Sequence, residues 1–278
     1  MTRHSPPLAG VVGWPISHSK SPALHGHWLR RYGIAGHYIP MGVAPQDFET
    51  AIRALPRLGF RGVNITLPYK QTVLSLADKI SDRASLIGAA NTLIFREDGG
   101  IYADNTDGYG FIENLRQNAP GWSARSGPSL VLGAGGAARG IVSALVTEGA
   151  PEIRIANRTR QRAEILKDQY GARIAVVDWN RASDAMAGAT TIINTTSLGM
   201  TGQPALNVSF NAARGDAVAT DIVYNPLVTP FLAEAREAGL TTVDGLGMLL
   251  HQAAPGFRQW FEQTPEVDAD LRRAVLAG

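Results

Sequence analysis

The sequence contains no cysteine at any of its 278 positions. Without thiols the chain forms no disulfide, thiolate zinc site or iron–sulfur cluster, and it has no cysteine nucleophile. Long apolar runs are also absent, since no stretch approaches the ~20 apolar residues that a membrane span requires. The opening segment MTRHSPP includes no apolar stretch of the kind found in secretory signals. These absences predict a cytoplasmic protein with no membrane partner.

A large excess of charge of one sign is missing as well. The 26 basic and 24 acidic side chains leave a formal net charge of +2, and the basic residues are scattered. No stripe of Lys and Arg with interleaved aromatics occurs, so no nucleic acid partner is expected. Apolar residues make up 45% of the chain and charged residues 18%, which is typical of a folded globular protein. At this length we expect two domains, each with its own core.

The first part of the chain has the pattern of an α/β unit. Apolar residues at helical spacing predict helices, and short β-rich runs bounded by turn residues predict strands. Asp98-Gly99-Gly100 between two such runs predicts a hairpin, and hence a mixed sheet. The expected helices are residues 19–32 and 46–55, and the expected apolar or β-rich runs are residues 8–13, 37–40, 60–65, 91–95 and 101–103.

From residue 128 onward, strands alternate regularly with helices. This rhythm predicts a parallel, doubly wound sheet. The expected strands are residues 129–132, 152–156, 174–177, 190–194, 217–222 and 241–243, and the expected helices end near residue 148 or span 160–170 and 230–238. Residues 246–261 then place apolar side chains, Trp260 and Phe261 among them, on one helical face that we expect to be core. Pro255-Gly256 inside that pattern predicts a kinked or split helix.

A glycine-rich turn follows the strand expected at 129–132. Its residues are Gly133, Ala134, Gly135, Gly136 and Ala137, and a helix begins there. In this context the first glycine permits a tight turn, and the second lets the backbone approach a pyrophosphate. The helix N-terminus offers N–H groups and a partial positive charge. The turn therefore predicts a dinucleotide site, with a ligand-free βα turn as the alternative.

The end of the next strand predicts which dinucleotide is bound. An NAD enzyme usually carries Asp or Glu there to bind the ribose 2′-hydroxyl. This chain instead has Asn157, Arg158 and Thr159, with Arg162 one helical turn further on. Two guanidinium groups suit a 2′-phosphate, because hydrogen bonds to charged groups contribute roughly 1.5–3 kcal/mol each. We therefore predict NADP(H), the alternative being that both arginines only solvate the start of a helix.

Polar strings outside the nucleotide-binding half suggest a hydrophilic substrate. They offer hydroxyls, amides, an ammonium group and carboxylates, which suit a small carboxylic acid with several hydroxyls. The strings are GWPISHSKSP at 13–22, GVNITLPYK at 62–70, GAANT at 88–92 and DNTDG at 104–108.

With these motifs the sequence resembles the shikimate dehydrogenase family along nearly its whole length. The resemblance extends to the strings at 133–139, 157–159, 194–200, 221–226 and 244–252. It implies two lobes: a substrate and catalytic domain at residues 1–108, completed by C-terminal helices at 246–278 that return to it, and a Rossmann-like NADP domain at 109–245. Two positions depart from the family pattern: Trp14 stands where many members have Asn, and Tyr69 where His is common.

The resemblance also implies a role for individual residues. Ser17 and Ser19 would bind the substrate carboxylate, and Lys70 and Asp107 would be the catalytic pair. Contacts to the ring hydroxyls are implied for Thr66, Asn91 and Gln252, and Tyr224 is expected to line the substrate cleft. The implied cofactor residues are those of the glycine-rich turn and Asn157, Arg158, Thr159, Arg162, Thr196, Ile222, Gly245 and Met248. The implied reaction is the reversible, NADP(H)-dependent reduction of 3-dehydroshikimate to shikimate in the synthesis of chorismate and aromatic amino acids.

The chemistry of the two catalytic candidates fits ketone reduction. A lysine is protonated at neutral pH and can supply the proton that the developing alkoxide needs. A neighbouring carboxylate favours the charged ammonium form. Acid–base help of this kind typically contributes ~10²–10⁴-fold in rate. If Lys70 is instead only an exposed lysine at the start of a helix, it has no such role.

Three other functions remain as alternatives. A quinate/shikimate dehydrogenase with broader substrate or NAD use is the nearest, although the paired serines and the Asn-Arg-Thr string argue against it. A catalytically silent dinucleotide-binding regulator would lack Lys70 or Asp107, and both are present. A methylene-folate type dehydrogenase has no motif support. The sequence leaves the oligomeric state open, with a homodimer among the possibilities.

The remaining polar residues favour ordinary roles. His18, His25 and His27 have no acidic or thiol ligands at useful spacing, so we expect no metal and place them on the surface or on a helix face. Ser197 lacks the Gly-x-Ser-x-Gly context of a hydrolase nucleophile.

Overall fold

The computed structural model describes residues 6–277 and forms two compact units. Unit 1 comprises Met1–Thr106 and Leu250–Gly278, and unit 2 comprises Asp107–Leu249. Residues 1–5 lie outside the described residues. They belong to the opening segment MTRHSPP, in which the sequence predicts no secretory signal. Within residues 6–277, no helix has the length and apolar character needed to cross a membrane.

Unit 1 is built on a mixed sheet with the strand order β2-β1-β3-β5-β6-β4. β1 pairs in parallel with β2 and β3, whereas β5 runs antiparallel to β3 and β6. The expected mixed sheet and hairpin are therefore confirmed. The strands are β1 (Leu8–Gly13), β2 (His37–Gly42), β3 (Phe60–Ile65), β4 (Lys79–Ile80), β5 (Thr92–Phe95) and β6 (Ile101–Asp104).

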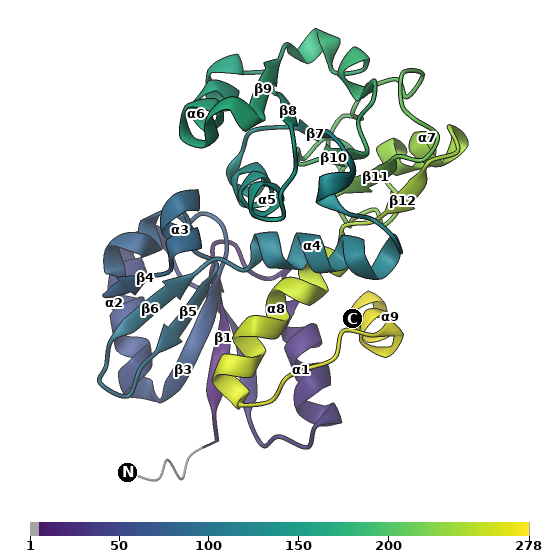
Figure 1. The fold of residues 1–278 in the computed structure, drawn as a ribbon. Helices are drawn as coiled ribbons and strands as arrows, with labels where there is room; N and C mark the ends of the chain where they lie inside the picture. Colours follow the sequence, from purple (N-terminus) through teal and green to yellow (C-terminus); the bar gives the residue numbers. More distant parts are fainter. Residues whose placement is uncertain (1–5, 278) are drawn as a thin grey trace. The chain divides into compact units, whose positions relative to one another are not determined.

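Helices cover both faces of this sheet (Figure 1). The helices of unit 1 are α1 (Ser21–Arg31), α2 (Phe48–Ala54), α3 (Asp82–Ile87), α9 (Ala269–Ala277) and residues 250–261 of α8 (Leu246–Phe261). On one face, α1 and α8 bury Trp28, Phe257 and Trp260 together. On the other face, Ile52 of α2 and Ala84 of α3 pack in one core cluster with strand residues.

The last long helix is continuous, so the expected split at Pro255 does not occur. α8 runs unbroken from Leu246 to Phe261 with Pro255 inside it. A proline in a helix interior costs about 3 kcal/mol, because it removes one backbone hydrogen bond and crowds the preceding turn. Burial of Phe257 and Trp260 on the C-terminal side offsets this cost. As expected, Trp260 and Phe261 are buried.

Unit 2 contains an all-parallel sheet with the order β12-β11-β10-β7-β8-β9. Numbered from its own first strand, this order is that of a doubly wound dinucleotide-binding sheet. The strands are β7 (Ser129–Leu132), β8 (Ile153–Ala156), β9 (Ile174–Val177), β10 (Thr191–Asn194), β11 (Val218–Asp221) and β12 (Thr241–Val243). The fold class expected from the sequence is confirmed.

Helices flank both faces of this second sheet as well (Figure 1). They are α4 (Asp107–Asn118), α5 (Gly136–Thr147), α6 (Arg160–Tyr170) and α7 (Pro230–Glu237). One core cluster joins α4, α5 and α6 to the sheet, and another joins α7 to the opposite face. The local sequence pattern does not predict α4, because Gly108 and Gly110 lower its helix propensity. Packing explains Gly108, where a Cβ would lie 2.8 Å from the carbonyl oxygen of Gly140 in α5.

Candidate active site

One edge of the unit 1 sheet collects the polar strings that the sequence singled out. β1 and β3 are parallel, and β5 and β6 alternate in direction, so the carboxyl ends of β1, β3 and β6 lie beside the amino end of β5. The segments 13–22, 66–70, 88–92 and 104–107 all begin or end there. Topology therefore brings together residues that are dispersed in the sequence.

Backbone hydrogen bonds tie the loop after β1 to the loop after β3. Thr66 N–H donates to the carbonyl of Val12 (3.0 Å), and Trp14 N–H donates to the carbonyl of Leu67 (3.1 Å). A Cβ on Gly13 would lie 2.5 Å from Cγ2 of Thr66, so only glycine permits this approach. The loop after β1 also carries the two candidate serines, Ser17 and Ser19. Ser17 is exposed, whereas Ser19 is half-buried and its Oγ accepts from the N–H of Ser21 (3.3 Å).

Lys70 follows β3 in a turn that is anchored on both sides. Its carbonyl accepts a hydrogen bond from Ala90 N–H (2.7 Å), which joins it to the segment before Asn91. The preceding Tyr69 stacks on Phe48 of α2 with ring centroids 4.0 Å apart, and its hydroxyl donates to the carbonyl of Val43. These contacts hold the backbone of the half-buried Lys70 at the polar edge.

Asn91 is the centre of a buried hydrogen-bond network. Its Oδ1 accepts from the Thr92 hydroxyl (2.9 Å), the Thr106 N–H (2.9 Å) and the Thr106 hydroxyl (3.1 Å). Because a backbone N–H can only donate, Oδ1 must face Thr106, and Nδ2 then faces Gln252 of α8, donating to its Oε1 (3.1 Å). The two amides expected to contact the substrate ring are thus joined and oriented.

The segment leading to Asp107 is fixed by the carboxylate of Asp104. Asp104 accepts from the Ser81 hydroxyl (2.7 Å) and from both Nε (2.6 Å) and Nη2 of Arg83. Burial acts to raise the pKa of this carboxyl, but the hydrogen bonds from Arg83 and Ser81 outweigh it and hold the pKa below its ordinary value. Asp107 itself is a buried residue at the start of α4.

In unit 2 the glycine-rich turn lies where the strand order reverses. β7 is flanked by β8 and β10, and crevices at such switch points are where dinucleotides bind in sheets of this type. Gly133 has φ +111°, and a Cβ there would lie 2.5 Å from Oγ1 of Thr195, which follows β10. By contrast, a Cβ on Gly135 or Gly136 would meet nothing within 4 Å, so the backbone there is open to a ligand.

The start of α5 suits a phosphate group. Its N-cap is Gly135, and no side chain caps the helix. The orphan N–H groups and the helix dipole therefore favour an anion at this end. Asn157, at the end of β8, braces the turn, since its Oδ1 accepts from Ala134 N–H (3.0 Å) and its Nδ2 donates to the carbonyl of Thr159 (2.7 Å).

Three arginines surround the start of α6, and they differ in their partners. Arg160 forms ion pairs with Glu164 (3.0 Å) and Asp178 (2.5 Å). Arg158 and Arg162 are exposed, and neither forms an ion pair with an acidic residue in the described part of the chain. Two guanidinium groups beside the turn are therefore available for an anionic group, and the 2′-phosphate of NADP has that character.

The remaining cofactor candidates lie at or near the carboxyl ends of β10, β11 and β12. Thr196 donates from its N–H and hydroxyl to Oδ1 of Asn194 (3.0 and 2.8 Å). A Cβ on Gly245 would lie 2.4 Å from the carbonyl oxygen of Ile222, so these two backbones are in close contact. Met248 packs against the core of unit 2. Tyr224 follows β11, and burial raises the pKa of its hydroxyl.

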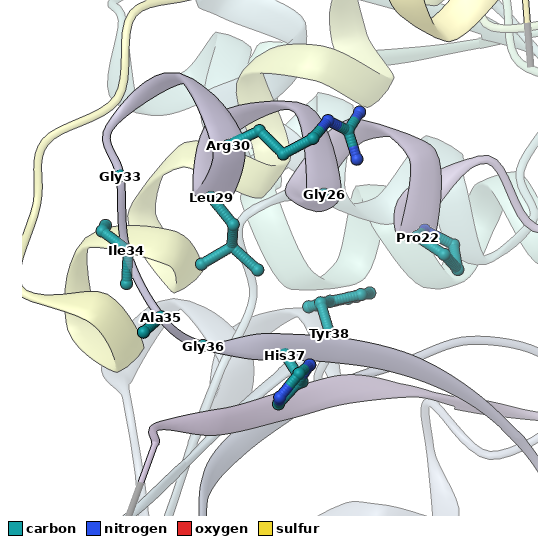
Figure 2. A pocket seen from close by; sticks show the side chains of 10 residues that line it. All are labelled: Pro22, Gly26, Leu29, Arg30, Gly33, Ile34, Ala35, Gly36, His37 and Tyr38. Atoms are coloured by element: carbon teal, nitrogen blue, oxygen red, sulfur yellow. The ribbon is translucent and has the colours of Figure 1, made fainter.

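A surface hollow in unit 1 contains none of the candidate residues. Figure 2 shows that it lies between α1 and the start of β2, with Arg30 on its helical side and His37 on its strand side.

The three histidines that the sequence places on the surface or on a helix face differ in burial. His18 is exposed and His27 is half-buried, but His25 is fully buried on the inner face of α1.

Family models match most of the chain. The description "Shikimate dehydrogenase substrate binding domain" matches residues 11–93, "Shikimate / quinate 5-dehydrogenase" matches residues 117–248, and "Shikimate 5'-dehydrogenase C-terminal domain" matches residues 245–274. Over 271 residues the chain is 60% identical to shikimate dehydrogenase (NADP(+)) of Paracoccus denitrificans, covering 98% of this chain and 96% of the relative. The chain belongs to the shikimate dehydrogenase family.

Solved structures of the shikimate dehydrogenase family and of a quinate enzyme have the same fold. Shikimate 5-dehydrogenase from Thermus thermophilus, in complex with NADP(H) and shikimate, has a TM-score of 0.87 at 36% identity, covering 98% of this chain and 99% of that one. Quinate dehydrogenase from Corynebacterium glutamicum, in complex with NAD, has a TM-score of 0.91 at 31% identity, with coverage of 98% and 99%. The resemblance found from the motifs is confirmed.

Several buried polar residues hold the loops of the candidate site in place, and the sequence pattern did not single them out. They are Asn64, Thr92, Thr106, Asn194, Asp221 and Thr229, all of them buried. Asn64, for example, accepts from the Tyr38 hydroxyl (2.7 Å) and donates to the carbonyl of Asn91 (3.1 Å). A usable signal was present, because Asn64, Asn194 and Asp221 are polar residues at or next to the carboxyl ends of apolar strands, where side chains face ligands.

Proposed function

We propose that this chain catalyses the reversible, NADP(H)-dependent reduction of 3-dehydroshikimate to shikimate. The observation that carries the proposal is the convergence of hydroxyls, amides and Lys70 at one edge of the unit 1 sheet. Family membership supports it. In this proposal residues 1–108, completed by 246–278, form the substrate and catalytic domain, and residues 109–245 form the NADP domain.

The substrate is a small acid with ring hydroxyls, and each part has a proposed partner. Ser17 and Ser19 would bind the carboxylate. Thr66, Asn91 and Gln252 would contact the ring hydroxyls, and Tyr224 is a further proposed substrate contact. The network around Asn91 supports its role, because an amide held in one orientation recognises a hydroxyl without first losing conformational freedom.

Lys70 and Asp107 are the proposed catalytic pair. In the reducing direction, the Lys70 ammonium donates a proton to the oxygen that becomes the alcohol. In the oxidising direction, Lys70 accepts that proton. Asp107 orients Lys70 and a ring hydroxyl.

NADPH, when bound, supplies the hydride. Its diphosphate would lie at the turn formed by Gly133, Ala134, Gly135, Gly136 and Ala137, against the uncapped start of α5. Arg158 and Arg162 would hold the 2′-phosphate, with Asn157 and Thr159 shaping that pocket. Ile222 and Gly245 would line the nicotinamide side, and Thr196 and Met248 would also contact the cofactor.

The double variant Arg158→Ala/Arg162→Ala tests the cofactor assignment. We expect kcat/KM for NADPH to fall at least tenfold while the value for NADH stays nearly constant, because only NADPH carries the 2′-phosphate. Arg160→Ala is the matched control: it removes a neighbouring arginine that is engaged in ion pairs, and should leave the NADPH/NADH ratio within twofold. An unchanged ratio in the double variant contradicts the assignment.

Lys70→Ala tests the proton donor. We expect kcat to fall by ~10²-fold or more, the usual contribution of acid–base catalysis, with the Kd for NADPH unchanged. Lys79→Ala, at an exposed lysine on β4 of the same unit, is the control and should keep wild-type kcat. Retention of more than a tenth of the wild-type kcat in Lys70→Ala is incompatible with the proposed role.

A quinate/shikimate dehydrogenase with broader substrate or NAD use is the second candidate. The similarity to the Corynebacterium quinate dehydrogenase favours considering it. Steady-state kinetics with shikimate or quinate, each with NADP⁺ or NAD⁺, separates the two. We expect the highest kcat/KM for shikimate with NADP⁺.

Two further properties stay predictions from the sequence. A cytoplasmic location is expected, and fractionation of the source cells tests it. The sequence leaves the oligomeric state open, with a homodimer among the possibilities, and light scattering coupled to size exclusion distinguishes a dimer from the 29.6 kDa monomer.

A further inference from the structure

Asp221 is a buried carboxyl group to which the proposed chemistry gives no role. It ends β11, and only 1% of its surface is exposed. Within residues 6–277, no lysine or arginine forms an ion pair with it, and burial raises its pKa. A carboxyl group buried without a cation is costly, so its presence at the carboxyl end of a strand in the nucleotide-binding sheet calls for a compensating role.

Three donors from separate segments converge on this carboxyl group. Oδ1 accepts from Asn194 Nδ2 (3.1 Å) and from Val223 N–H (2.9 Å). Oδ2 accepts from the hydroxyl of Thr229, which is the N-cap of α7 (2.7 Å). Asp221 therefore joins the end of β10, the loop after β11 and the start of α7.

Through Asn194, the effect of Asp221 extends to the loop after β10. The N–H of Thr196 donates to Oδ1 of Asn194, so the amide must turn its Nδ2 toward Asp221. The same Nδ2 also donates to the carbonyl of Leu198 (3.1 Å). If the carboxyl oxygen of Asp221 is removed, the side-chain amide of Asn194 loses one of the hydrogen bonds that orient it. The loop that carries Thr196 is then held less firmly.

The loop after β11 is held in the same way. Ile222 N–H donates to the carbonyl of Asn194 (3.1 Å), and the next N–H, that of Val223, donates to Asp221. The carbonyl of Ile222 is in turn in close contact with Gly245. In the proposed function Thr196, Ile222 and Gly245 bind the cofactor, and Ile222 and Gly245 line its nicotinamide side.

We infer that Asp221 is a positioning residue for the nicotinamide, holding the loops after β10 and β11 in the arrangement that hydride transfer requires. The inference rests on the proposed function, because that function assigns Thr196, Ile222 and Gly245 to the cofactor. Asp221 acts through these loops and does not itself contact the reacting atoms.

Asp221→Ala removes all three acceptor interactions, and Asp221→Asn is the conservative rescue. The asparagine oxygen can still accept from Asn194 and Val223, and its amide can donate to the Thr229 hydroxyl. Thr229→Val removes only the third interaction. The control is Asp216→Ala, which deletes a surface carboxylate of the same unit that is paired with Arg214.

The decisive readouts are KM for NADPH and the deuterium isotope effect with NADPH labelled at the transferred hydrogen. In Asp221→Ala we expect KM for NADPH to rise about tenfold and the isotope effect to increase, because a misplaced nicotinamide makes hydride transfer slower. Asp221→Asn should stay within threefold of wild type, Thr229→Val should be intermediate, and Asp216→Ala should match wild type. A purely structural role would lower only the amount of active enzyme, leaving KM and the isotope effect unchanged.

Wild-type KM and isotope effect in both Asp221→Ala and Thr229→Val overturn the inference, as does an Asp221→Asn variant as impaired as Asp221→Ala. If Asp221→Ala does not fold, as judged by circular dichroism, Thr229→Val decides. The Kd for NADPH, measured by quenching of protein fluorescence, needs no turnover. It tests Asp221 even if the wild-type enzyme proves inactive on 3-dehydroshikimate, an outcome that defeats the proposed function separately.

Discussion

We expect His25 to make the stability of unit 1 sensitive to mild acid. Its ring is fully buried on α1 and stacks on Tyr38 with centroids 3.9 Å apart, and Trp28 meets it edge-on at 5.6 Å. Neither ring nitrogen makes a hydrogen bond within residues 6–277. Burial lowers the pKa of His25 from 6.5 to about 3, against a smaller opposing effect from nearby Asn64. The imidazole is therefore neutral in the folded protein and charges readily only after unfolding.

The difference between the pKa of His25 in the folded and in the unfolded state sets the sign and size of the change in unfolding free energy with pH. The folded state binds fewer protons, so the contribution of His25 to stability is complete above pH 6.5 and is lost as the pH falls toward 3. Linkage with these two pKa values gives a loss of about 2 kcal/mol in the free energy of unfolding between pH 7 and pH 5. His25→Phe keeps an aromatic ring in the stack but cannot take up a proton, so this part of the pH dependence should vanish.

Urea unfolding followed by tryptophan fluorescence measures the effect, and Trp28 and Trp260 report on this region directly. The quantity to compare is the change in unfolding free energy between pH 7 and pH 5. His37→Gln, which replaces an exposed imidazole at the start of β2, is the control and should retain the wild-type change. If wild type and His25→Phe lose the same unfolding free energy between pH 7 and pH 5, then burial does not lower the pKa of His25 in the folded protein, and the prediction is refuted.

Three further outcomes follow from single positions. Gly62→Ala should lower the free energy of unfolding by about 2–3 kcal/mol in urea titrations, because a Cβ there would lie 2.1 Å from Nε1 of Trp260. Gly133→Ala should raise the Kd for NADPH about tenfold by fluorescence titration, since its φ of +111° and the nearby Thr195 hydroxyl exclude a side chain. The pKa of Asp104 in the folded protein is lowered from its ordinary value of 3.8. Its contribution to the free energy of unfolding is therefore complete well above pH 3.8 and is lost as the pH falls below 3.8. Wild type should therefore lose unfolding free energy between pH 5 and 3 that Asp104→Asn does not lose.

Local patterns in the sequence predicted most helices and strands, and the places where they failed have physical causes. Two glycines lower the helix propensity of α4, and the close approach of Gly108 to Gly140 explains one of them. Pro255 predicted a kink or a split in α8; the helix is not split, and burial of the aromatic residues that follow it keeps it continuous. In both cases contacts with residues distant in the sequence outweigh local preference.

For the candidate site, the sequence named residues that are expected to contact ligands, but it did not single out the residues that hold them in place. Lys70, Asn91 and the glycine-rich turn stand in recognisable strings, because ligand chemistry demands particular residue types. Thr106 and Asp221 were missed as organisers, although both lie within strings that carried the resemblance. Their roles depend on hydrogen-bond partners supplied by other segments of the fold.

By itself, the sequence determined the α/β class, the parallel and mixed character of the two sheets, the glycine-rich turn expected to bind a dinucleotide, and the absence of an acidic residue directly after the next strand. These features are encoded by periodicity and short motifs within about one element's length. Only the tertiary structure decided that Asn91 bonds to Gln252, 161 positions away, and that Arg160 is paired with Asp178 while its neighbours Arg158 and Arg162 are not. The physical reason is that a buried amide or carboxyl group must find its partners wherever the folded chain places them, and neither composition nor local pattern specifies that arrangement.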